Sequence, residues 1–130
     1  MDIKKHIIAL GFVPKNGTNG IYHKIYVDYA IEIDFETQSI NYGSAITADR
    51  KTTQNFSDAE NFVVLECIDR LLAKGYKPQN IVLEKTWPAG HGVSKHLDIC
   101  VNREDGTPYM LIECKTFGKE YNKELARIRK

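Results

Sequence analysis

Two carboxylates and one ammonium group stand out in the last third of the chain, at Asp98, Glu113 and Lys115. Because the side chains of a strand alternate between two faces, Glu113 and Lys115 should share one side of their apolar stretch. The dipeptide Asp105-Gly106, which lies between Asp98 and Glu113, is typical of a two-residue hairpin loop. With that loop Asp98 should lie directly opposite Glu113, with the two Cβ atoms roughly 5 Å apart.

Facing carboxylates of this kind have a chemical meaning. They repel each other and raise one another's proton affinity unless a cation lies between them. Their oxygen atoms suit Mg²⁺, for which Mn²⁺ can substitute and which leaves coordination positions for water and phosphate oxygen. Lys115, on the same face, can contact the attacking water or the phosphate and neutralise developing negative charge. The three residues therefore predict metal-dependent hydrolysis of a phosphodiester bond.

The elements that must position these residues predict an α/β fold in two parts. The first part, residues 1–56, has a helix that ends at Gly11, an antiparallel β-meander over residues 12–46 and a polar connector over residues 47–56. The second part, residues 57–130, begins with a helix introduced by the capping box Ser57–Glu60. Three strands of a mixed or antiparallel sheet should follow, over Ile81–Trp87, His96–Val101 and Tyr109–Phe117. A basic helix over Lys119–Lys130 should complete this part.

Composition limits the class of protein. A chain of 130 residues fits a single domain with one core. Its 18 basic and 17 acidic side chains create no overall basic field, so any contact with nucleic acid must come from a local patch. No apolar run approaches the roughly 20 residues of a membrane span, and charges interrupt the N-terminal stretch, which excludes a secretory signal. The three widely spaced cysteines are expected to be buried, reduced thiols of a cytoplasmic protein.

The spacing of Asp98 and the tripeptide Glu113-Cys114-Lys115 resembles the PD-(D/E)xK nuclease signature, with Leu97 where some members have proline. The surrounding text, NFSDAENFVVLECIDRLLAKGYKPQNIVLEKTWPAGHGVSKHLDICVNREDGTPYMLIECKTFGKEYNKE, resembles the N-terminal endonuclease domain of the DNA-translocating R subunit of type I restriction enzymes. This resemblance implies a single endonuclease-like domain over residues 1–130. Its restriction-endonuclease-like core would occupy residues 57–130 and would be truncated at its C-terminal end.

The resemblance also implies roles for individual residues. It assigns catalysis and metal binding to Asp98, Glu113, Lys115 and the backbone carbonyl of Cys114. An acidic residue of the first core helix often completes such a site, and Glu60 and Glu66 compete for this role. Glu60 is the expected ligand because it borders the sheet-facing side of the helix, whereas Glu66 lies on the solvent side. Glu60 could equally contact the Ser57 amide as part of the capping box.

The function implied by the resemblance is a magnesium-dependent endodeoxyribonuclease that cleaves double-stranded DNA without base preference of its own. Its partners would be the methylation and specificity subunits of a restriction complex. ATP would be used only by a motor domain that this chain lacks, because no glycine-rich Lys-Ser/Thr motif occurs in it. Lys119 and Lys123 could follow the DNA backbone, although a solvated helix face explains their spacing equally well.

Other interpretations stay open. The chain could be a non-catalytic DNA-binding or assembly module with a nuclease fold, or a PD-(D/E)xK nuclease of a repair or methylation-dependent defence system. A zinc site at His91, His96 and Cys100 is disfavoured because a second pair of ligands is missing. Glu84 could be an additional metal ligand, but we expect it to be an exposed strand carboxylate.

Overall fold

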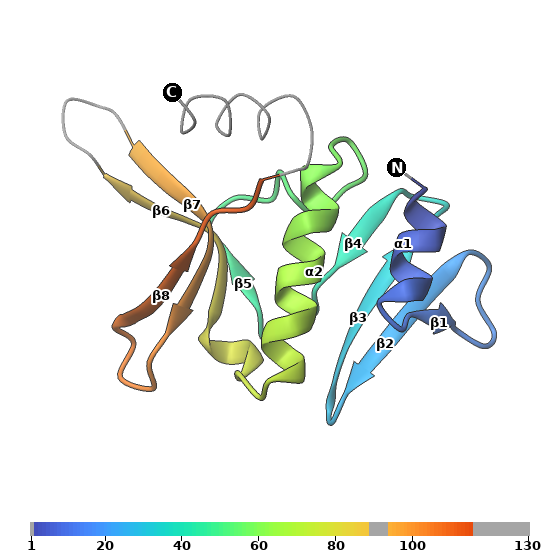
Figure 1. Ribbon diagram of the computed structural model, residues 1–130, viewed down its shortest axis with the longest axis horizontal. Coiled ribbons are helices and arrows are strands. Elements are labelled where there is room, and N and C mark those ends of the chain that lie inside the picture. The colour runs from blue at the N-terminus through green and yellow to red at the C-terminus, as the bar shows by residue number, and fades with distance from the viewer. Residues whose placement is uncertain (1, 89–93, 116–130) are drawn as a thin grey trace, which may run out of the picture.

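The computed structural model describes residues 2–88 and 94–115, which form two sheets with a long helix between them (Figure 1). The chain opens with helix α1, Ile3–Ala9, whose first turn is capped by the Asp2 side chain. The first sheet contains β1 (Val13–Pro14), β2 (Ile21–Tyr26), β3 (Tyr29–Asp34) and β4 (Ser39–Asn41). Its strands are ordered β1-β2-β3-β4 and every neighbouring pair is antiparallel, which confirms the predicted meander.

The second sheet differs from its prediction by one strand. It contains β5 (Thr47–Ala48), β6 (Ile81–Pro88), β7 (Ser94–Asn102) and β8 (Pro108–Ile112), in that order. Three strands were expected, but β5, within the predicted connector, pairs in parallel with β6 and makes the sheet mixed and four-stranded. The pairing continues beyond β5, where the Asp49 N–H donates to the Leu83 carbonyl at 3.1 Å. The helix expected over Lys119–Lys130 lies outside the described residues.

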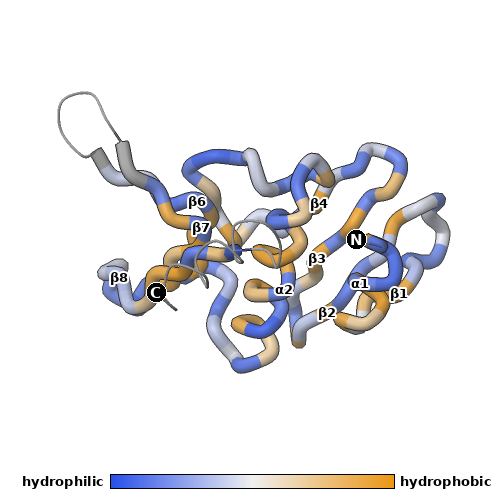
Figure 2. The backbone as a smooth tube through the Cα atoms, turned by 45° about the horizontal axis from the view of Figure 1, so that its top comes forward, coloured by the Kyte–Doolittle hydropathy of each residue, from blue (hydrophilic) through white to orange (hydrophobic). Residues whose placement is uncertain are grey.

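Helix α2, Glu60–Ala73, lies between the two sheets, and the short 3₁₀ helix η1, Pro78–Asn80, leads from it into β6. The buried side chains of α2 are Asn61, Phe62, Val64, Leu65, Ile68, Asp69, Leu71 and Leu72. They cover about half of the helix circumference, a wider stripe than a helix packed against one sheet needs. Hydrophobic residues accordingly concentrate in α2 and in the strands on either side of it (Figure 2), and one buried cluster includes residues of both sheets and both α-helices.

A polar cluster inside this interface joins the first sheet to both α-helices. The Lys24 ammonium, on β2, donates to the carbonyl of Leu10 at 2.6 Å and to Asp69 Oδ1, on α2, at 2.7 Å. The Tyr26 hydroxyl donates to the same oxygen at 2.6 Å. Burial, followed by the hydrogen bond to Asp69, raises the pKa of Tyr26. The phenol therefore stays protonated and acts as a donor to the carboxylate.

Replacing Asp69 with alanine should lower the free energy of unfolding by about 3 kcal/mol, because it leaves the Lys24 ammonium without its anion in a largely buried position. Glu66→Ala is the matched control on the same helix, since the Glu66–Arg70 pair is far more exposed and should contribute less than about 1 kcal/mol. Urea denaturation of both variants measures the difference. Equal losses would mean that the Lys24–Asp69 pair has no special weight in the interface.

Candidate functional site

The β7–β8 hairpin brings the predicted site residues toward one another. Its ladder pairs Ile99 with Ile112, Cys100 with Leu111 and Val101 with Met110. This is the predicted register, in which the next pair along the hairpin is Asp98 with Glu113. The ladder ends one pair earlier, so Asp98 and Glu113 lie just beyond it.

The loop that sets this register is longer than predicted. The Arg103 N–H donates to the Thr107 carbonyl at 2.8 Å, and the Gly106 N–H donates to the Arg103 carbonyl at 2.9 Å. The loop therefore includes Glu104 as well as Asp105 and Gly106, and Gly106 takes a left-handed φ of +89° that glycine adopts without steric cost. An irregularity in the ladder beside Asn102 compensates for the extra residue, and the predicted register results.

Just beyond the end of β8, the Asp98 carboxylate accepts a hydrogen bond from the backbone of the segment that follows this strand. Its Oδ2 accepts a hydrogen bond from the Cys114 N–H at 2.7 Å, so that this amide pairs with a side chain of β7. The predicted strand Tyr109–Phe117 is therefore wrong after Ile112 within the described residues, and the expectation that Glu113 and Lys115 alternate as strand residues no longer applies. The side chains of Glu113 and Lys115 are both exposed.

An acidic pocket lies at the N-terminal end of α2. It has a volume of about 290 Å³, and its lining residues are Thr52, Thr53, Ser57, Asp58, Glu60, Asn61, Glu84, His96 and Asp98. The structure thus brings together Glu60 and Asp98, two of the four predicted metal ligands. Glu113 and Cys114 do not line this pocket, but the Cys114 amide is hydrogen-bonded to Asp98 on its wall.

Glu84 belongs to this pocket, and the prediction that it is exposed is wrong. Glu84 is 3% exposed. It lies on β6 between the Leu83–Ile99 and Lys85–Leu97 pairs, and this position in the register faces Asp98 on β7. The Thr52 N–H donates to Glu84 Oε2 at 2.8 Å and the Thr52 hydroxyl donates to Oε1. Thr53 contributes longer bonds. These donors compensate for burial of the carboxylate. The Glu84 backbone has a left-handed φ of +51°, which is costly outside glycine.

Replacing Glu84 with glutamine should lower the free energy of unfolding by about 1–3 kcal/mol, because an amide nitrogen would face a donor that now meets a carboxylate oxygen. Glu66→Gln is the control, since Glu66 lies on the outer side of α2, where it forms an ion pair with Arg70. Chemical denaturation at neutral pH compares the two. A Glu84 variant as stable as wild type would show that the Thr52 hydrogen bonds contribute little.

The capping box predicted for the start of α2 is not formed. The Ser57 N–H donates to Asn55 Oδ1 at 2.9 Å instead of to Glu60, and the Glu60 N–H donates to Asp58 Oδ1 at 2.9 Å. Asp58 therefore satisfies a free amide of the first turn and places a negative charge at the positive end of the helix dipole. Glu66 forms an ion pair with Arg70 at 3.4 Å, in agreement with its predicted place away from the sheets.

Two thiols meet beside the site. The Cys114 Sγ lies 3.6 Å from the Cys67 Sγ on α2 and donates a hydrogen bond to it. This bond lowers the pKa of Cys67 to about 7, while the same bond and burial raise the pKa of Cys114. Burial raises the pKa of Cys100, whose thiol donates to Asn102 Oδ1 at 3.3 Å. All three cysteines are free; Cys100 and Cys114 are buried as predicted, whereas Cys67 is partly exposed.

The donor chemistry of the acidic pocket suits a hard divalent cation, since carboxylate oxygens line it. Their present arrangement is not that of a completed site: among the described residues, no three His, Cys, Asp or Glu side chains converge as a metal-binding group. Asp98 Oδ2 is engaged by the Cys114 amide, and both oxygens of Glu84 are engaged by threonines. Of the zinc alternative, His96 lines the pocket and Cys100 bonds to Asn102, while His91 lies outside the described residues.

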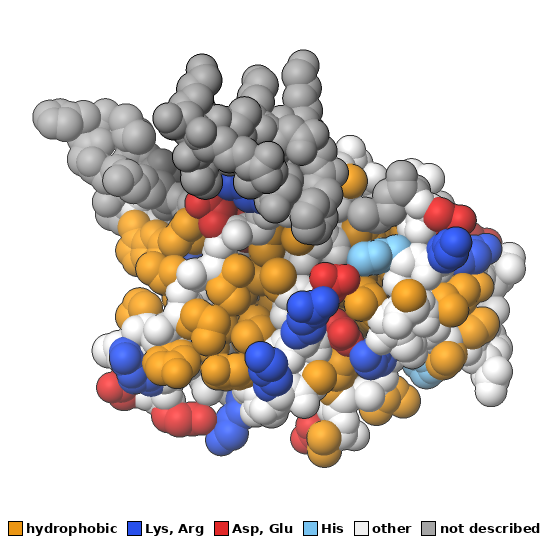
Figure 3. Space-filling model, viewed as in Figure 1, with side chains coloured by type: hydrophobic (Ala, Val, Ile, Leu, Met, Phe, Trp, Pro, Cys, Tyr) orange, Lys and Arg blue, Asp and Glu red, His pale blue; other side chains and the backbone are white. Residues whose placement is uncertain are grey.

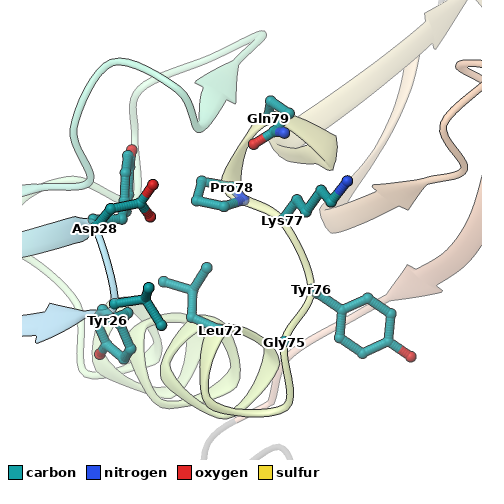
Figure 4. A pocket seen from close by; sticks show the side chains of 10 residues that line it. Tyr26, Asp28, Leu72, Gly75, Tyr76, Lys77, Pro78 and Gln79 are labelled. Carbon is teal, nitrogen blue, oxygen red and sulfur yellow. The ribbon is translucent and has the colours of Figure 1, made fainter.

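A second cavity, of about 330 Å³, lies at the opposite end of α2, between that end and the β2–β3 turn. Figure 4 shows Leu72 pointing into this opening, whereas the Tyr76 ring and the Lys77 amine point away from it. Its lining includes one carboxylate, from Asp28. The larger number of carboxylates in its lining therefore distinguishes the pocket at Glu60 and Asp98 as the better candidate for chemistry.

Comparisons with known proteins leave the family of the chain unassigned: neither a scan against protein-family models nor a search of curated proteins finds a match. Within the described ranges, neither α-helix has the length and apolar character of a bilayer-spanning segment. The predicted DNA-contacting residues Lys119 and Lys123 lie outside those ranges.

Sequence reasoning did not include Thr52, Asp58 and His96 in the site. Glu84 was weighed as a metal ligand, and the sequence held a signal for its burial: it follows the apolar run Ile81–Leu83 in a strand, where an exposed carboxylate is unusual. Thr52 gave no such signal, because it reaches the pocket through hydrogen bonds to Glu84, which lies 32 positions later in the sequence.

Proposed function

We propose that this chain is the metal-dependent endonuclease domain of a type I restriction system, with a restriction-endonuclease-like core of the PD-(D/E)xK type. It hydrolyses phosphodiester bonds of double-stranded DNA in the cytoplasm without reading bases itself. The observation that carries the proposal is the hydrogen bond from the Cys114 amide to Asp98, together with the β7–β8 register. Cys114, which lies between Glu113 and Lys115 in the sequence, is thereby bonded to a carboxylate that lines an acidic pocket.

In this proposal Asp98, Glu113, the Cys114 carbonyl and Glu60 hold Mg²⁺ or Mn²⁺. The ion, when bound, supplies positive charge to the phosphate and to the developing negative charge of the reaction. The Cys114 amide orients Asp98 through its hydrogen bond, and the Glu84–threonine bonds hold the opposite wall of the pocket. The Lys115 ammonium contacts the scissile phosphate or the attacking water and stabilises the transition state electrostatically.

Contact with DNA requires a local surface, because the net charge of the chain is only +1. On the face drawn in Figure 3, Lys and Arg side chains are interspersed with acidic ones, and apolar side chains gather over β8 and α2. We assign the phosphate contacts to Lys115 and to Lys119 and Lys123, the two lysines that the sequence predicts to contact DNA. In a complete restriction complex, the methylation and specificity subunits would direct the domain to DNA, and ATP would serve only a separate motor domain.

The proposal is tested by combining metal binding with cleavage. Calorimetric titration with Mn²⁺ should show binding by the wild-type chain, and supercoiled plasmid should be converted to the nicked form in Mg²⁺ or Mn²⁺ but not in EDTA. Glu66→Gln, outside the proposed site, should behave as wild type in both assays. Nicking that persists in EDTA would contradict the proposal.

Replacing Glu113 with glutamine should leave thermal stability unchanged or raise it in the absence of metal, because it neutralises one of the carboxylates that the proposal assigns to the same ion. The same change should weaken Mn²⁺ binding at least about tenfold and reduce nicking. Thermal unfolding with and without Mn²⁺ measures both effects. Glu104→Gln, at the far loop of the same hairpin, is the control. Marked destabilisation of the Glu113 variant would assign that side chain a structural role instead.

A second candidate is a non-catalytic DNA-binding or assembly module with the same fold. The observation that favours it is the absence of three converging metal-ligand side chains among the described residues. DNA binding that is unaffected by Mn²⁺, in a chain that gives no calorimetric signal with Mn²⁺, would support this module over the nuclease.

A further inference from the structure

Two thiols from separate elements lie against each other in the described part of the chain. Cys67 is on α2 and Cys114 follows β8. Their Sγ atoms are 3.6 Å apart, although the two residues are 47 positions apart in the sequence. Cys114 is 3% exposed, whereas Cys67 is partly open to solvent. The third cysteine, Cys100, has its thiol directed to Asn102 Oδ1 instead. An oxidant can therefore reach the Cys67 thiol, and the Cys114 thiol is close enough to react with the oxidised Cys67.

We propose that Cys67 and Cys114 form a redox modification site, in which a peroxide converts the two thiols to an intramolecular disulfide. The disulfide joins the segment after β8 to helix α2. A disulfide requires the sulfur atoms to approach to about 2.05 Å, so the present separation must shrink by roughly 1.5 Å. Side-chain rotation together with a small displacement of the Cys114 segment, which is no longer held in the β8 ladder, can supply this movement.

The chemistry balances with hydrogen peroxide as the oxidant. The Cys67 sulfur attacks one peroxide oxygen, the O–O bond breaks, and Cys67 sulfenic acid and one water are formed. The Cys114 sulfur then attacks the Cys67 sulfur; the S–O bond breaks, and the hydroxyl leaves as a second water with the Cys114 proton. Two thiols are oxidised by two electrons and one peroxide is reduced to two waters.

A buried hydroxyl lies in the same neighbourhood. Tyr42 is 2% exposed, and its hydroxyl has no hydrogen-bond partner among the described residues. Burial, followed by the charges of Cys114 and Cys67, raises the pKa of Tyr42, so its phenol stays protonated.

The expected consequence concerns the candidate metal site, and this part of the inference rests on the proposed function. The amide of Cys114 holds Asp98 by a 2.7 Å hydrogen bond, and Glu113 is the preceding residue. Drawing Cys114 toward α2 pulls on that bond and displaces Glu113. A loss of supporting contacts of this kind typically weakens metal binding by about 10- to 100-fold.

The disulfide is tested directly on the purified 130-residue chain. After reduction, removal of the reductant and treatment with hydrogen peroxide, the wild type should lose two of its three titratable thiols. Peptide mapping without reductant should identify a Cys67–Cys114 link, which dithiothreitol should reverse. Cys100→Ser should form the same link, whereas Cys67→Ser and Cys114→Ser should each abolish it. A disulfide between two chains, a link that involves Cys100, or sulfinic acid at Cys67 without any link would overturn the proposal.

A Mn²⁺ titration of the reduced and oxidised forms separates the two proposals. Weaker binding by at least about tenfold in the oxidised form, restored by dithiothreitol, is the expected result. If reduced protein binds no Mn²⁺ while the mapped disulfide still forms, the proposed function fails and the modification site stands. If the disulfide forms and both forms bind Mn²⁺ equally, the modification does not control the metal site.

Discussion

Replacing Lys115 with alanine should slow metal-dependent nicking of supercoiled DNA by about 10²- to 10³-fold while leaving Mn²⁺ affinity within a factor of a few of wild type. The reason is that the exposed ammonium holds no metal in the proposed site and acts on negative charge that develops during the reaction. The change should also leave the fold intact, because an exposed side chain beyond β8 contributes little to stability.

The measurement for Lys115 is the initial rate of conversion of supercoiled to nicked plasmid at saturating Mn²⁺, beside calorimetric Mn²⁺ affinity of the same preparations. Lys77→Ala is the matched control, since Lys77 is an exposed lysine at the other end of α2 that pairs with Glu104 at 3.1 Å. Equal nicking by wild type and Lys115→Ala would place the cleaving activity elsewhere or in a contaminant. Loss of Mn²⁺ binding in the alanine variant would show that Lys115 organises the site instead of acting on the phosphate.

Asp98 is expected to have two separable roles, and a pair of substitutions distinguishes them. Asp98→Asn keeps an oxygen that can accept the Cys114 N–H but removes the negative charge, so Mn²⁺ affinity should fall at least about tenfold with stability near that of wild type. Asp98→Ala removes the acceptor as well. It leaves the Cys114 amide unsatisfied, and the free energy of unfolding should fall by about a further 1–3 kcal/mol.

Thermal unfolding and Mn²⁺ calorimetry on the three proteins test this separation. If the asparagine variant binds Mn²⁺ as tightly as wild type, Asp98 is not a metal ligand. If both variants lose the same stability, the Cys114 hydrogen bond contributes nothing that an amide oxygen can replace. Either outcome would weaken the proposed function, which depends on Asp98 both as a metal ligand and as the link between the Glu113–Lys115 segment and the acidic pocket.

Local signals predicted much of the fold. The interruption near Asp28 separates β2 from β3, and the apolar periodicity after Glu60 gives α2. The register of the β7–β8 hairpin was also predicted, although by an incomplete argument: a longer loop and an irregularity beside Asn102 compensate for each other. A dipeptide such as Asp105-Gly106 indicates where a hairpin turns, but the loop length depends on contacts such as that of Arg103 with Thr107.

The features that could not be predicted depend on partners distant in the chain. β5 is a two-residue strand without periodicity and exists because β6 pairs with it. Glu84 is buried because Thr52 and Thr53 supply donors from a polar segment that by itself predicts only a connector. The end of β8 is likewise set from across the hairpin, by the Asp98 side chain. In each case a tertiary hydrogen bond overrides the local pattern.

Because α2 is enclosed on both sides, its axial position is a compromise between two neighbours. Asp69 bonds the helix to the meander through Lys24 and Tyr26. On the same helix, Glu60 lines the acidic pocket together with Asp98, and Cys67 contacts Cys114. A substitution in the meander that shifted α2 along its axis would therefore change the relative positions of the pocket carboxylates without contacting them. In this sense the first sheet controls the geometry of groups that belong to the second sheet.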